Sequence, residues 1–305
     1  MSHQVETPQV TTRQRPRNLG DLWLALVFIA PALIGFLVFL LWPTLRGIWL
    51  SFTDFNLLTP PKFIGFTNFI RMSEDPVFWN SAKVTLLYVV INIGVQTVVS
   101  LVIAVLMHRL TQSTFVRSVV LAPYLVANVV AALVFLWILD TQLGVGNQVV
   151  VALGMDRIPF LNQESTVIPT IALINVWRHM GYTALLIFAG LQMIPETVYE
   201  AARIDGASEW RTFWRITMPL LRPILALVLI MTIIGSFQVF DTVAVTTDGG
   251  PVNSSNVLQL YIYDMAFGRF QFGYASALSV ALLAILLVVT TLQYKLSRAG
   301  ETDLN

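Results

Sequence analysis

Six long apolar stretches constrain the fold of this chain more than any other feature. A helix needs about 20 largely apolar residues to cross the hydrocarbon core of a bilayer. The stretches of that length are residues 23–42, 84–107, 117–139, 168–194, 220–241 and 274–296. Several are framed by Trp or Tyr, which prefer the headgroup region. They predict an all-α integral membrane protein with six transmembrane helices.

The composition agrees with a membrane protein. Of the 305 residues, 56% are hydrophobic and only 11% are charged, whereas soluble domains carry about 25% charged residues. A net charge of +1 without one basic patch argues against a nucleic-acid partner. Because the chain has no cysteine, disulfides and cysteine-ligated metal sites are excluded.

The distribution of Lys and Arg predicts the orientation. With the N-terminus inside, eleven of the eighteen fall in inner segments, six fall in outer segments, and Arg178 lies within a span. The positive-inside rule favours this arrangement. We therefore expect both termini to be cytoplasmic.

The apolar pattern divides the chain into five parts. They are a cytoplasmic tail (1–22), a first transmembrane helix (23–42), an extracytoplasmic segment (43–83), a five-helix core (84–298) and a second cytoplasmic tail (299–305). The aromatic residues of 63–69 predict that the extracytoplasmic segment folds against the outer membrane face. The core contains the most informative loop, residues 195–219.

This loop has signals for two short helices. Thr197 and Glu200 have the spacing of a capping box that starts a helix, and Gly206 supplies the backbone freedom that ends it. Ser208 is placed to cap a second helix. Pro219 then marks the entry into the fifth span. The pattern predicts a stiff protrusion into the cytoplasm.

The same loop resembles the EAA loop of binding-protein-dependent ABC importer permeases. Glu200-Ala201-Ala202, three residues, Gly206, nine residues and Ile216-Thr217-Met218-Pro219 match the spacing of that motif. One departure is Met218 where the family usually has Leu, a change that conserves volume. Asp205 to Ser208 and Asp248-Gly249-Gly250-Pro251 are similar to the carbohydrate-uptake branch, which includes the maltose and glycerol-phosphate permeases.

The resemblance implies a type I ABC importer permease fold in a bacterial inner membrane. It implies a pathway shared with a second homologous permease, two ATP-binding subunits below it, and an extracytoplasmic solute-binding protein above it. It places ATPase coupling at Glu200, Ala201, Ala202, Asp205 and Gly206. The expected cargo is a sugar or sugar-derived solute.

Independently, the chain lacks a Gly-x-x-x-x-Gly-Lys-Ser/Thr phosphate loop. We therefore expect a transport subunit without its own ATPase site or catalytic residues. ATP and Mg would be bound by the partner subunits, and no metal or cofactor by this chain.

Polar residues within spans are costly and therefore indicate function. The candidate solute contacts are Tyr124, Asn128, Asn175, Thr232, Ser236, Gln238 and Asp241. Tyr124 and Asn128 lie one helical turn apart in span three, where matching positions of the sugar-permease branch face the solute, and Asn175 resembles the Asn of the Asn-x-Trp of that branch. Their hydroxyl, amide and aromatic groups suit a sugar. Asn92 and Gln96, four residues apart in span two, fit an interhelical hydrogen bond at least as well as a pore lining, and are left out of this set.

Arg178 in span four has two open interpretations. It either forms an ion pair with an acid such as Asp241, which is favoured because unpaired intramembrane charge is rare, or it attracts an anionic solute.

Two other classes of protein fit the sequence less well than an importer permease does. An ion-coupled secondary transporter needs intramembrane carboxylates, and only Asp241 is available, at the edge of a span. An intramembrane enzyme needs a metal cluster or an acid and base pair, but the three histidines, His3, His108 and His179, are far apart in the sequence. Neither class explains residues 200–219.

Overall fold

The computed structural model describes residues 19–111 and 113–297. Most of the predicted first tail and all of the predicted last tail lie outside these residues. Within the described part the chain is helical, and its one β-feature is an isolated bridge between Thr53 and Phe63. The chain separates into two units, residues 1–49 and 50–305, which are described separately.

The first unit is one apolar helical run. It consists of α1 (Leu19–Phe36), a π-helical turn (Leu37–Leu41) and α2 (Trp42–Leu50). The segment Leu26–Leu50 is long and apolar enough to cross a membrane. The helix continues to Leu50, eight residues beyond the predicted span of residues 23–42, and the bounds of that span in the membrane stay a prediction. Its large apolar side chains are exposed, as a helix facing lipid requires.

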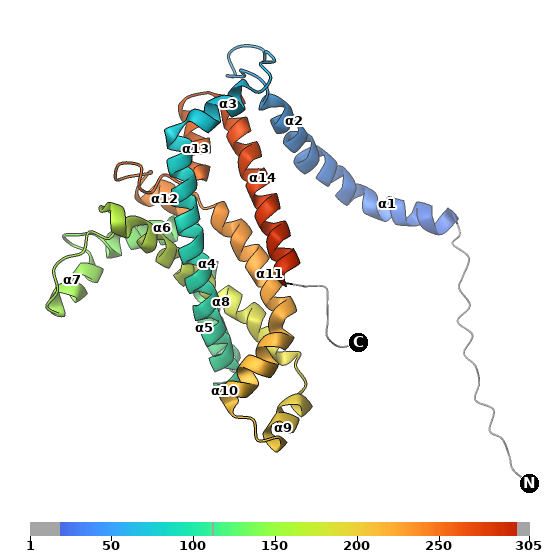
Figure 1. Cartoon of the computed structure of the whole chain (residues 1–305), viewed down its shortest axis with the longest axis vertical. Helices are drawn as coiled ribbons and strands as arrows, with labels where there is room; N and C mark the ends of the chain where they lie inside the picture. The colour runs from blue at the N-terminus through green and yellow to red at the C-terminus, as the bar shows by residue number, and fades with distance from the viewer. Residues whose placement is uncertain (1–18, 112, 298–305) are drawn as a thin grey trace, which may run out of the picture. The chain divides into compact units, whose positions relative to one another are not determined.

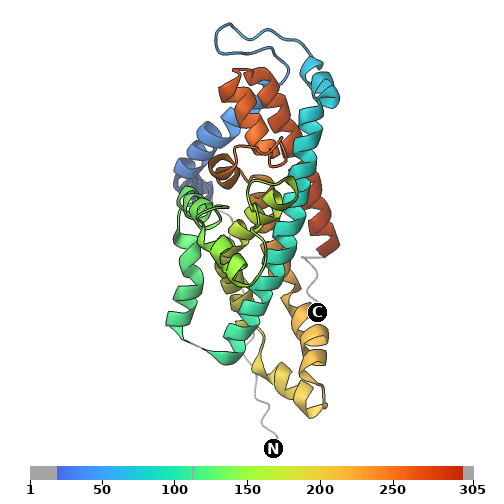
Figure 2. The ribbon, with the colours of Figure 1, turned by 90° about the vertical axis from the view of Figure 1, so that its left-hand side faces the viewer.

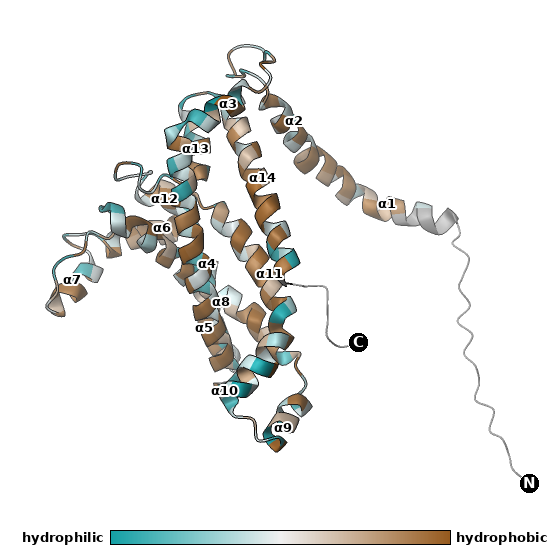
Figure 3. Cartoon of the chain, in the orientation of Figure 1, coloured by the Kyte–Doolittle hydropathy of each residue, from teal (hydrophilic) through white to brown (hydrophobic). Residues whose placement is uncertain are grey.

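The second unit contains the remaining helices, with α9 and α10 at one end and α3 and α13 at the other (Figures 1 and 2). Its helices are α3 (Thr67–Glu74), α4 (Pro76–Leu110), α5 (Thr114–Leu125), α6 (Asn128–Ile138), α7 (Val145–Ala152), α8 (Glu164–Gln192), α9 (Glu196–Ile204), α10 (Glu209–Thr212), α11 (Met218–Phe237), α12 (Asp241–Thr246), α13 (Leu258–Tyr263) and α14 (Phe272–Ser297). We call these the α9 end and the α3 end. The long helices between them are apolar along most of their length (Figure 3).

Five of the described helical runs meet the length and hydropathy of a membrane span, or six when α5 and α6 count as one. This agrees with the predicted all-α membrane fold. The prediction of one continuous third helix over residues 117–139 was wrong, because α5 and α6 are bent by 89° at Val126 and Ala127.

The core of the second unit lies where α4 packs against α8, with α11 and α14 beside them. Tyr88, Ile168 and Ile171 are among its fully buried side chains. Close helix packing depends on Gly190, where an added Cβ would lie 2.9 Å from Ile224 of α11. Small residues at such contacts are typical of helix packing in membranes.

At the α3 end, the carboxylate of Asp75 joins three helices. It caps α4 by accepting hydrogen bonds from the backbone N–H groups of Val77 (2.9 Å) and Phe78 (3.4 Å). It also accepts from the hydroxyls of Tyr261 on α13 (2.5 Å) and Tyr274 on α14 (2.6 Å). Burial alone would raise the pKa of this carboxyl, but the four hydrogen bonds outweigh burial and hold the pKa below its usual value.

The lowered pKa of Asp75 predicts a pH dependence of stability. The ionised carboxylate stabilises the folded chain fully above the ordinary pKa of 3.8, and this contribution is lost as pH falls through the lower folded value. In detergent, Asp75→Asn should lower the thermal unfolding midpoint at neutral pH, and its difference from the native chain should shrink below about pH 4. Asp264→Asn, which removes an exposed ion pair with Arg269, is the control and should have little effect. A difference for Asp75→Asn that stays constant from pH 7 to pH 3 would contradict this account.

Candidate transport cavity and coupling loop

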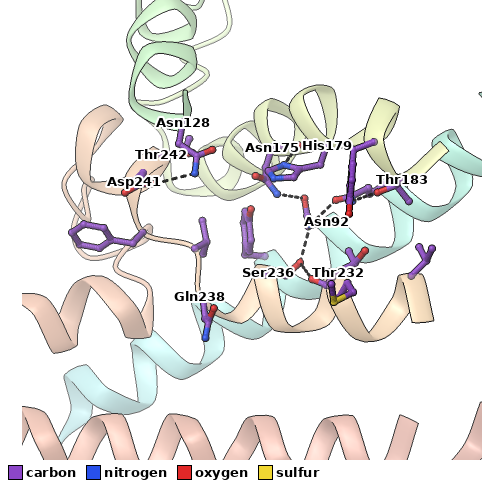
Figure 4. A pocket seen from close by; sticks show the side chains of 18 of the residues that line it. Asn92, Asn128, Asn175, His179, Thr183, Thr232, Ser236, Gln238, Asp241 and Thr242 are labelled. Carbon is purple, nitrogen blue, oxygen red and sulfur yellow. Dashed lines mark hydrogen bonds between the residues drawn. The ribbon is translucent and has the colours of Figure 1, made fainter. Parts of the chain in front are cut away.

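A cavity of about 280 Å³ lies in the second unit. It is lined by α4, α6, α8, α11, α12 and the link between α11 and α12. The lining residues are Tyr88, Asn92, Gln96, Asn128, Asn175, His179, Tyr182, Thr183, Leu186, Val228, Met231, Thr232, Gly235, Ser236, Gln238, Val239, Phe240, Asp241 and Thr242. Most of these residues are polar, which is unusual for a cavity between membrane helices (Figure 4).

Two interruptions of the helices supply much of this lining. Helix α11 ends at Phe237 and α12 begins at Asp241, which leaves Gln238 to Phe240 outside regular helix. The break between α5 and α6 places Asn128 at the start of α6. Non-helical backbone at membrane depth is tolerated where it is buried in protein or lines a water-filled cavity. Both interruptions therefore indicate a binding site within the membrane rather than helices that only cross it.

Asn92 of α4 is the centre of a hydrogen-bond network that joins three helices (Figure 4). Its amide nitrogen donates to Ser236 Oγ of α11 (2.8 Å) and to Gln96 Oε1 (3.2 Å). Its amide oxygen accepts from the amide nitrogen of Asn175 on α8 (3.0 Å). Gln96 in turn donates to Thr183 Oγ1 (2.9 Å). Only 1% of Asn92 is exposed, so its amide is committed to holding α4, α8 and α11 in register.

A second polar pair connects the two interrupted segments. The amide nitrogen of Asn128 donates to Asp241 Oδ2 at 3.0 Å, and α6 packs along α12. Asp241 lies in the first turn of α12, where the helix dipole favours a carboxylate. The pair places an acidic side chain on one side of the cavity.

Other polar groups on the cavity wall are not engaged within the part of the chain that the structure describes. The side chains of Thr232 and Gln238 make no hydrogen bond there, and Gln238 is exposed. The hydroxyl of Tyr88, a residue with no exposed surface, is buried without a partner. Thr232 and Gln238 are therefore free to bind a hydroxylated molecule, whereas the fully buried Tyr88 hydroxyl has no accessible surface in this structure.

Six of the seven predicted solute contacts line this one cavity: Asn128, Asn175, Thr232, Ser236, Gln238 and Asp241. Their contact with a solute stays a prediction. Tyr124 is not among the lining residues. It stacks on Tyr182, which does line the cavity, with ring centroids 4.5 Å apart. The premise that Tyr124 and Asn128 lie one helical turn apart was wrong, since the break separates them.

Several lining residues are not among the predicted solute contacts. Asn92 and Gln96 were set aside as an interhelical pair, and in the structure they both join helices and line the cavity. His179, Tyr182 and Thr183 follow Asn175 at offsets of four, seven and eight residues. That spacing puts them on one helix face and was the available signal.

The favoured ion pair between Arg178 and Asp241 was also wrong. The guanidinium of Arg178 donates from Nε to the carbonyl of Val126 (2.8 Å) and from Nη2 to the carbonyl of Tyr124 (3.4 Å). Arg178 is not a lining residue of the cavity. The charged guanidinium therefore binds backbone carbonyls at the break between α5 and α6.

At the α9 end, the predicted loop of residues 195–219 contains one short helix and the start of a long one. Helix α9 begins at Glu196 with Pro195 as N-cap and makes no side-chain capping bond, so the predicted capping box was wrong. Thr197 lies inside the helix, where its backbone position cannot cap. Gly206 ends the helix with φ +69°, as its residue type predicts.

Ser208 caps the next helix as predicted, accepting from the backbone N–H of Arg211 (3.4 Å). That helix is not separate from the fifth span. It passes through a π-helical turn (Phe213–Thr217) into α11, so Pro219 lies within a continuous run. An ion pair joins Arg109 at the end of α4 to Glu209 at the start of α10.

The five predicted coupling residues lie on or next to α9. Glu200, Ala201, Asp205 and Gly206 are exposed, and Ala202 is buried. Ile204, in the last turn of the helix, is 87% exposed. In the described part of the chain the Glu200 side chain has no hydrogen bond or ion pair. Exposed apolar and acidic side chains on one short, well-terminated helix form a surface that another protein can bind.

Comparison with known proteins agrees with these features. Residues 96–299 match the family described as binding-protein-dependent transport system inner membrane component. The chain is similar to the sulfoquinovosyl glycerol transport system permease protein SmoG of Agrobacterium fabrum (34% identity over 301 residues, 96% of this chain and 98% of that protein). It is also similar to the lactose transport system permease protein LacF of Rhizobium radiobacter (33% over 299 residues, 94% and 98%).

A solved structure has the same fold. It is that of a bacterial alginate ABC transporter in complex with alginate pentasaccharide-bound periplasmic protein. The match has a TM-score of 0.81 at 24% identity and covers 92% of this chain and 96% of that one. The predicted ABC importer permease fold is thus confirmed.

A bundle of membrane helices with broken spans around a polar cavity is the architecture of a transport subunit. This chain belongs to the family of binding-protein-dependent transport system inner membrane components, which are the permease subunits of ABC importers.

Proposed function

We propose that this chain forms its share of the translocation pathway for an uncharged, sugar-like solute, and that partner ATPases drive the pathway through α9. The observation that carries the proposal is the lining of the cavity. It combines amides, hydroxyls and aromatic rings, which suit the hydroxyl groups and the apolar ring faces of a sugar.

The charge of the cavity argues for an uncharged solute. No Lys or Arg is among the lining residues, and the carboxylate of Asp241 would repel an anion. Arg178, which lies next to the lining residue His179, donates to backbone carbonyls. This argues against the anionic sugar that the second interpretation of Arg178 would require.

The relatives do not decide the charge of the solute by themselves. SmoG is named for a sulfonated glycoside and LacF for the neutral sugar lactose. The choice between an anionic and a neutral solute therefore depends on the side chains of this cavity, and they favour a neutral solute.

The remaining parts of the importer follow from the family. A second permease would complete the pathway, two ATP-binding subunits would hold ATP and Mg and dock on α9, and a solute-binding protein would deliver the solute at the α3 end. This chain would contribute no ATPase site. The proposed place is the bacterial cytoplasmic membrane, with both termini and the α9 end on the cytoplasmic side, and with the tails, outer segment and core bounded as the sequence predicts.

Removing an unengaged cavity group tests the site. In proteoliposomes that hold the complete importer, uptake of lactose, maltose, trehalose and the anionic glucose 6-phosphate would be compared. We expect uptake of at least one neutral disaccharide and none of the glucose 6-phosphate.

Gln238→Ala should raise the half-saturating concentration for uptake of that disaccharide about three- to tenfold, which corresponds to the loss of one hydrogen bond.

Gln148→Ala on α7, outside the cavity, is the matched control and should leave uptake unchanged. Uptake of the anionic sugar alone, or of none of the neutral ones, would contradict the proposed solute class. An unchanged half-saturating concentration in Gln238→Ala would contradict the proposed contact.

A further inference from the structure

Arg178 of α8 lies beside the corner where the third membrane segment breaks. Its Nε and Nη2 atoms donate to the carbonyls of Val126 and Tyr124, which belong to the end of α5 and its C-cap. Its guanidinium carbon also lies 5.4 Å from the centre of the Tyr124 ring. One side chain thus holds both the backbone and a side chain of this corner.

The contact answers a specific physical need. The last carbonyls of a helix have no partner within the helix, and at membrane depth water is not freely available to bind them. In α5 the Pro123 carbonyl is bound by the N–H of Val126, whereas those of Tyr124 and Val126 are bound by Arg178. A cation at the C-terminal end of a helix is also favoured by the helix dipole. Arg178 therefore acts as a C-terminal cap supplied by a neighbouring helix.

Close packing holds α5 against α8 just below this cap. An added Cβ on Gly181 would lie 1.8 Å from the carbonyl oxygen of Val120, so only glycine permits the observed approach. One residue further, Tyr182 stacks on Tyr124 with an interplanar angle of 12°. Up to the corner, α5 is therefore fixed to α8.

Beyond the corner, α6 turns away and brings Asn128 to Asp241 at the edge of the cavity. Asn128 is only two residues from Val126, the residue whose carbonyl Arg178 binds. The direction of α6, and with it the position of this polar pair, depends on the backbone conformation at that point. Without the cap, nothing else among the described side chains binds these two carbonyls.

Arg178 also fixes the histidine that lines the cavity. Its Nη1 lies 2.9 Å from His179 Nε2. Because an arginine only donates, Nε2 must accept, and the ring proton is on Nδ1, which donates to the Asn175 carbonyl (3.0 Å). The imidazole at the cavity is therefore held neutral in one orientation.

We propose that Arg178 is a positioning residue: it caps the broken third segment, sets the direction of α6, and so places Asn128, Asp241 and His179 around the cavity. Its effect on transport rests on the proposed function, whereas its effect on the corner does not. Arg178 touches no solute in this account and acts through the residues that it positions.

Spin labels on the two arms of the corner measure its geometry directly. Val119 on α5 and Val134 on α6 are exposed and lie about equally far from the break, and the chain has no native cysteine. From a rise of 1.5 Å per residue, their backbones are about 16 Å apart across a right-angle corner and about 23 Å apart across a straight helix. Val119→Cys and Val134→Cys would be labelled in the full chain in lipid nanodiscs.

Arg178→Met keeps the bulk of the side chain and removes its donors. We expect the ratio of short to long distances to fall about tenfold, because charged hydrogen bonds to the carbonyls are lost. Arg178→Lys should largely restore the short distance. Arg117→Ala is the matched control, since it removes the other arginine between α5 and α8, which lies over the Phe188 ring, and should leave the distance unchanged.

An unchanged short distance in Arg178→Met would overturn the proposal, as would an equal change in Arg117→Ala, which would indicate a general loosening of α5. In the assembled importer, Arg178→Met should raise the half-saturating concentration of the transported neutral disaccharide much more than it lowers the maximal rate. A change of distance without any effect on uptake would support the role of Arg178 at the corner but contradict its role in positioning the cavity residues for the solute. Because the distances need no transport, failure of the proposed function would be seen separately.

Discussion

Replacing Glu200 by arginine is expected to stop ATP-driven uptake while the chain still folds and inserts. Glu200 is exposed on α9, and within the described residues its side chain has no partner that the substitution would break. The effect must therefore arise at a contact with another protein. A like-charge contact in a docking surface costs several kcal/mol, so uptake should fall by about 30-fold or more.

Uptake in whole cells and ATPase activity of the purified complex would be measured together. Glu164→Arg is the matched control, because it reverses an exposed charge in the first turn of α8, away from α9. It should leave both activities near native. Native uptake in Glu200→Arg would remove the coupling role of this residue, and loss of the folded chain from the membrane would show that the effect is structural.

The second large effect is expected from Asn92→Leu. The substitution preserves volume but removes the donors to Ser236 and Gln96 and the acceptor for Asn175. Each buried polar group left without a partner costs about 1–3 kcal/mol, so the thermal midpoint should fall by about 5–10 °C. Uptake should fall about tenfold or more, because Asn175 and Ser236 lose the contact that orients them towards the cavity.

Asn80→Leu, on the same helix, is the control for this substitution. Asn80 donates one hydrogen bond to the carbonyl of Asn253 outside the cavity. Its loss should cost little in stability and nothing in uptake. If both variants lost stability equally, or if Asn92→Leu transported normally, the network around Asn92 would not have the proposed importance.

The membrane spans could be predicted from the sequence because the length of an apolar run is a local property. The interruptions within them could not. The break at Val126 and Ala127 depends on Arg178, which is 52 residues away from Val126 in the sequence. No periodicity around residue 126 contains that partner. For the same reason Tyr124 was placed in the cavity and Arg178 was paired with the wrong group.

Loop features were predictable where they depend on one residue type. Gly206 has the positive φ and Ser208 the capping bond that their residue types favour. The capping box failed because Pro195 takes the N-cap position, so Thr197 is already inside α9. A capping box needs the correct helix start as well as the correct spacing.

Most of the candidate site followed from the cost of polar groups in a membrane. That rule selected Asn128, Asn175 and Gln238, which line the cavity. It did not rank Asn92, because a side chain that joins helices and one that faces a cavity have the same sequence signal. Only the packed helices show that Asn92 does both.

Crosslinking from α9 tests the central claim most directly. A photoreactive amino acid at Ile204, which is 87% exposed, would be activated in cells that express the complete importer. A covalent product with the ATP-binding subunit is expected, and none from the same probe at exposed Leu153, just beyond α7. Absence of an ATPase product at Ile204, or labelling of this position by a reagent confined to the external side, would contradict that claim.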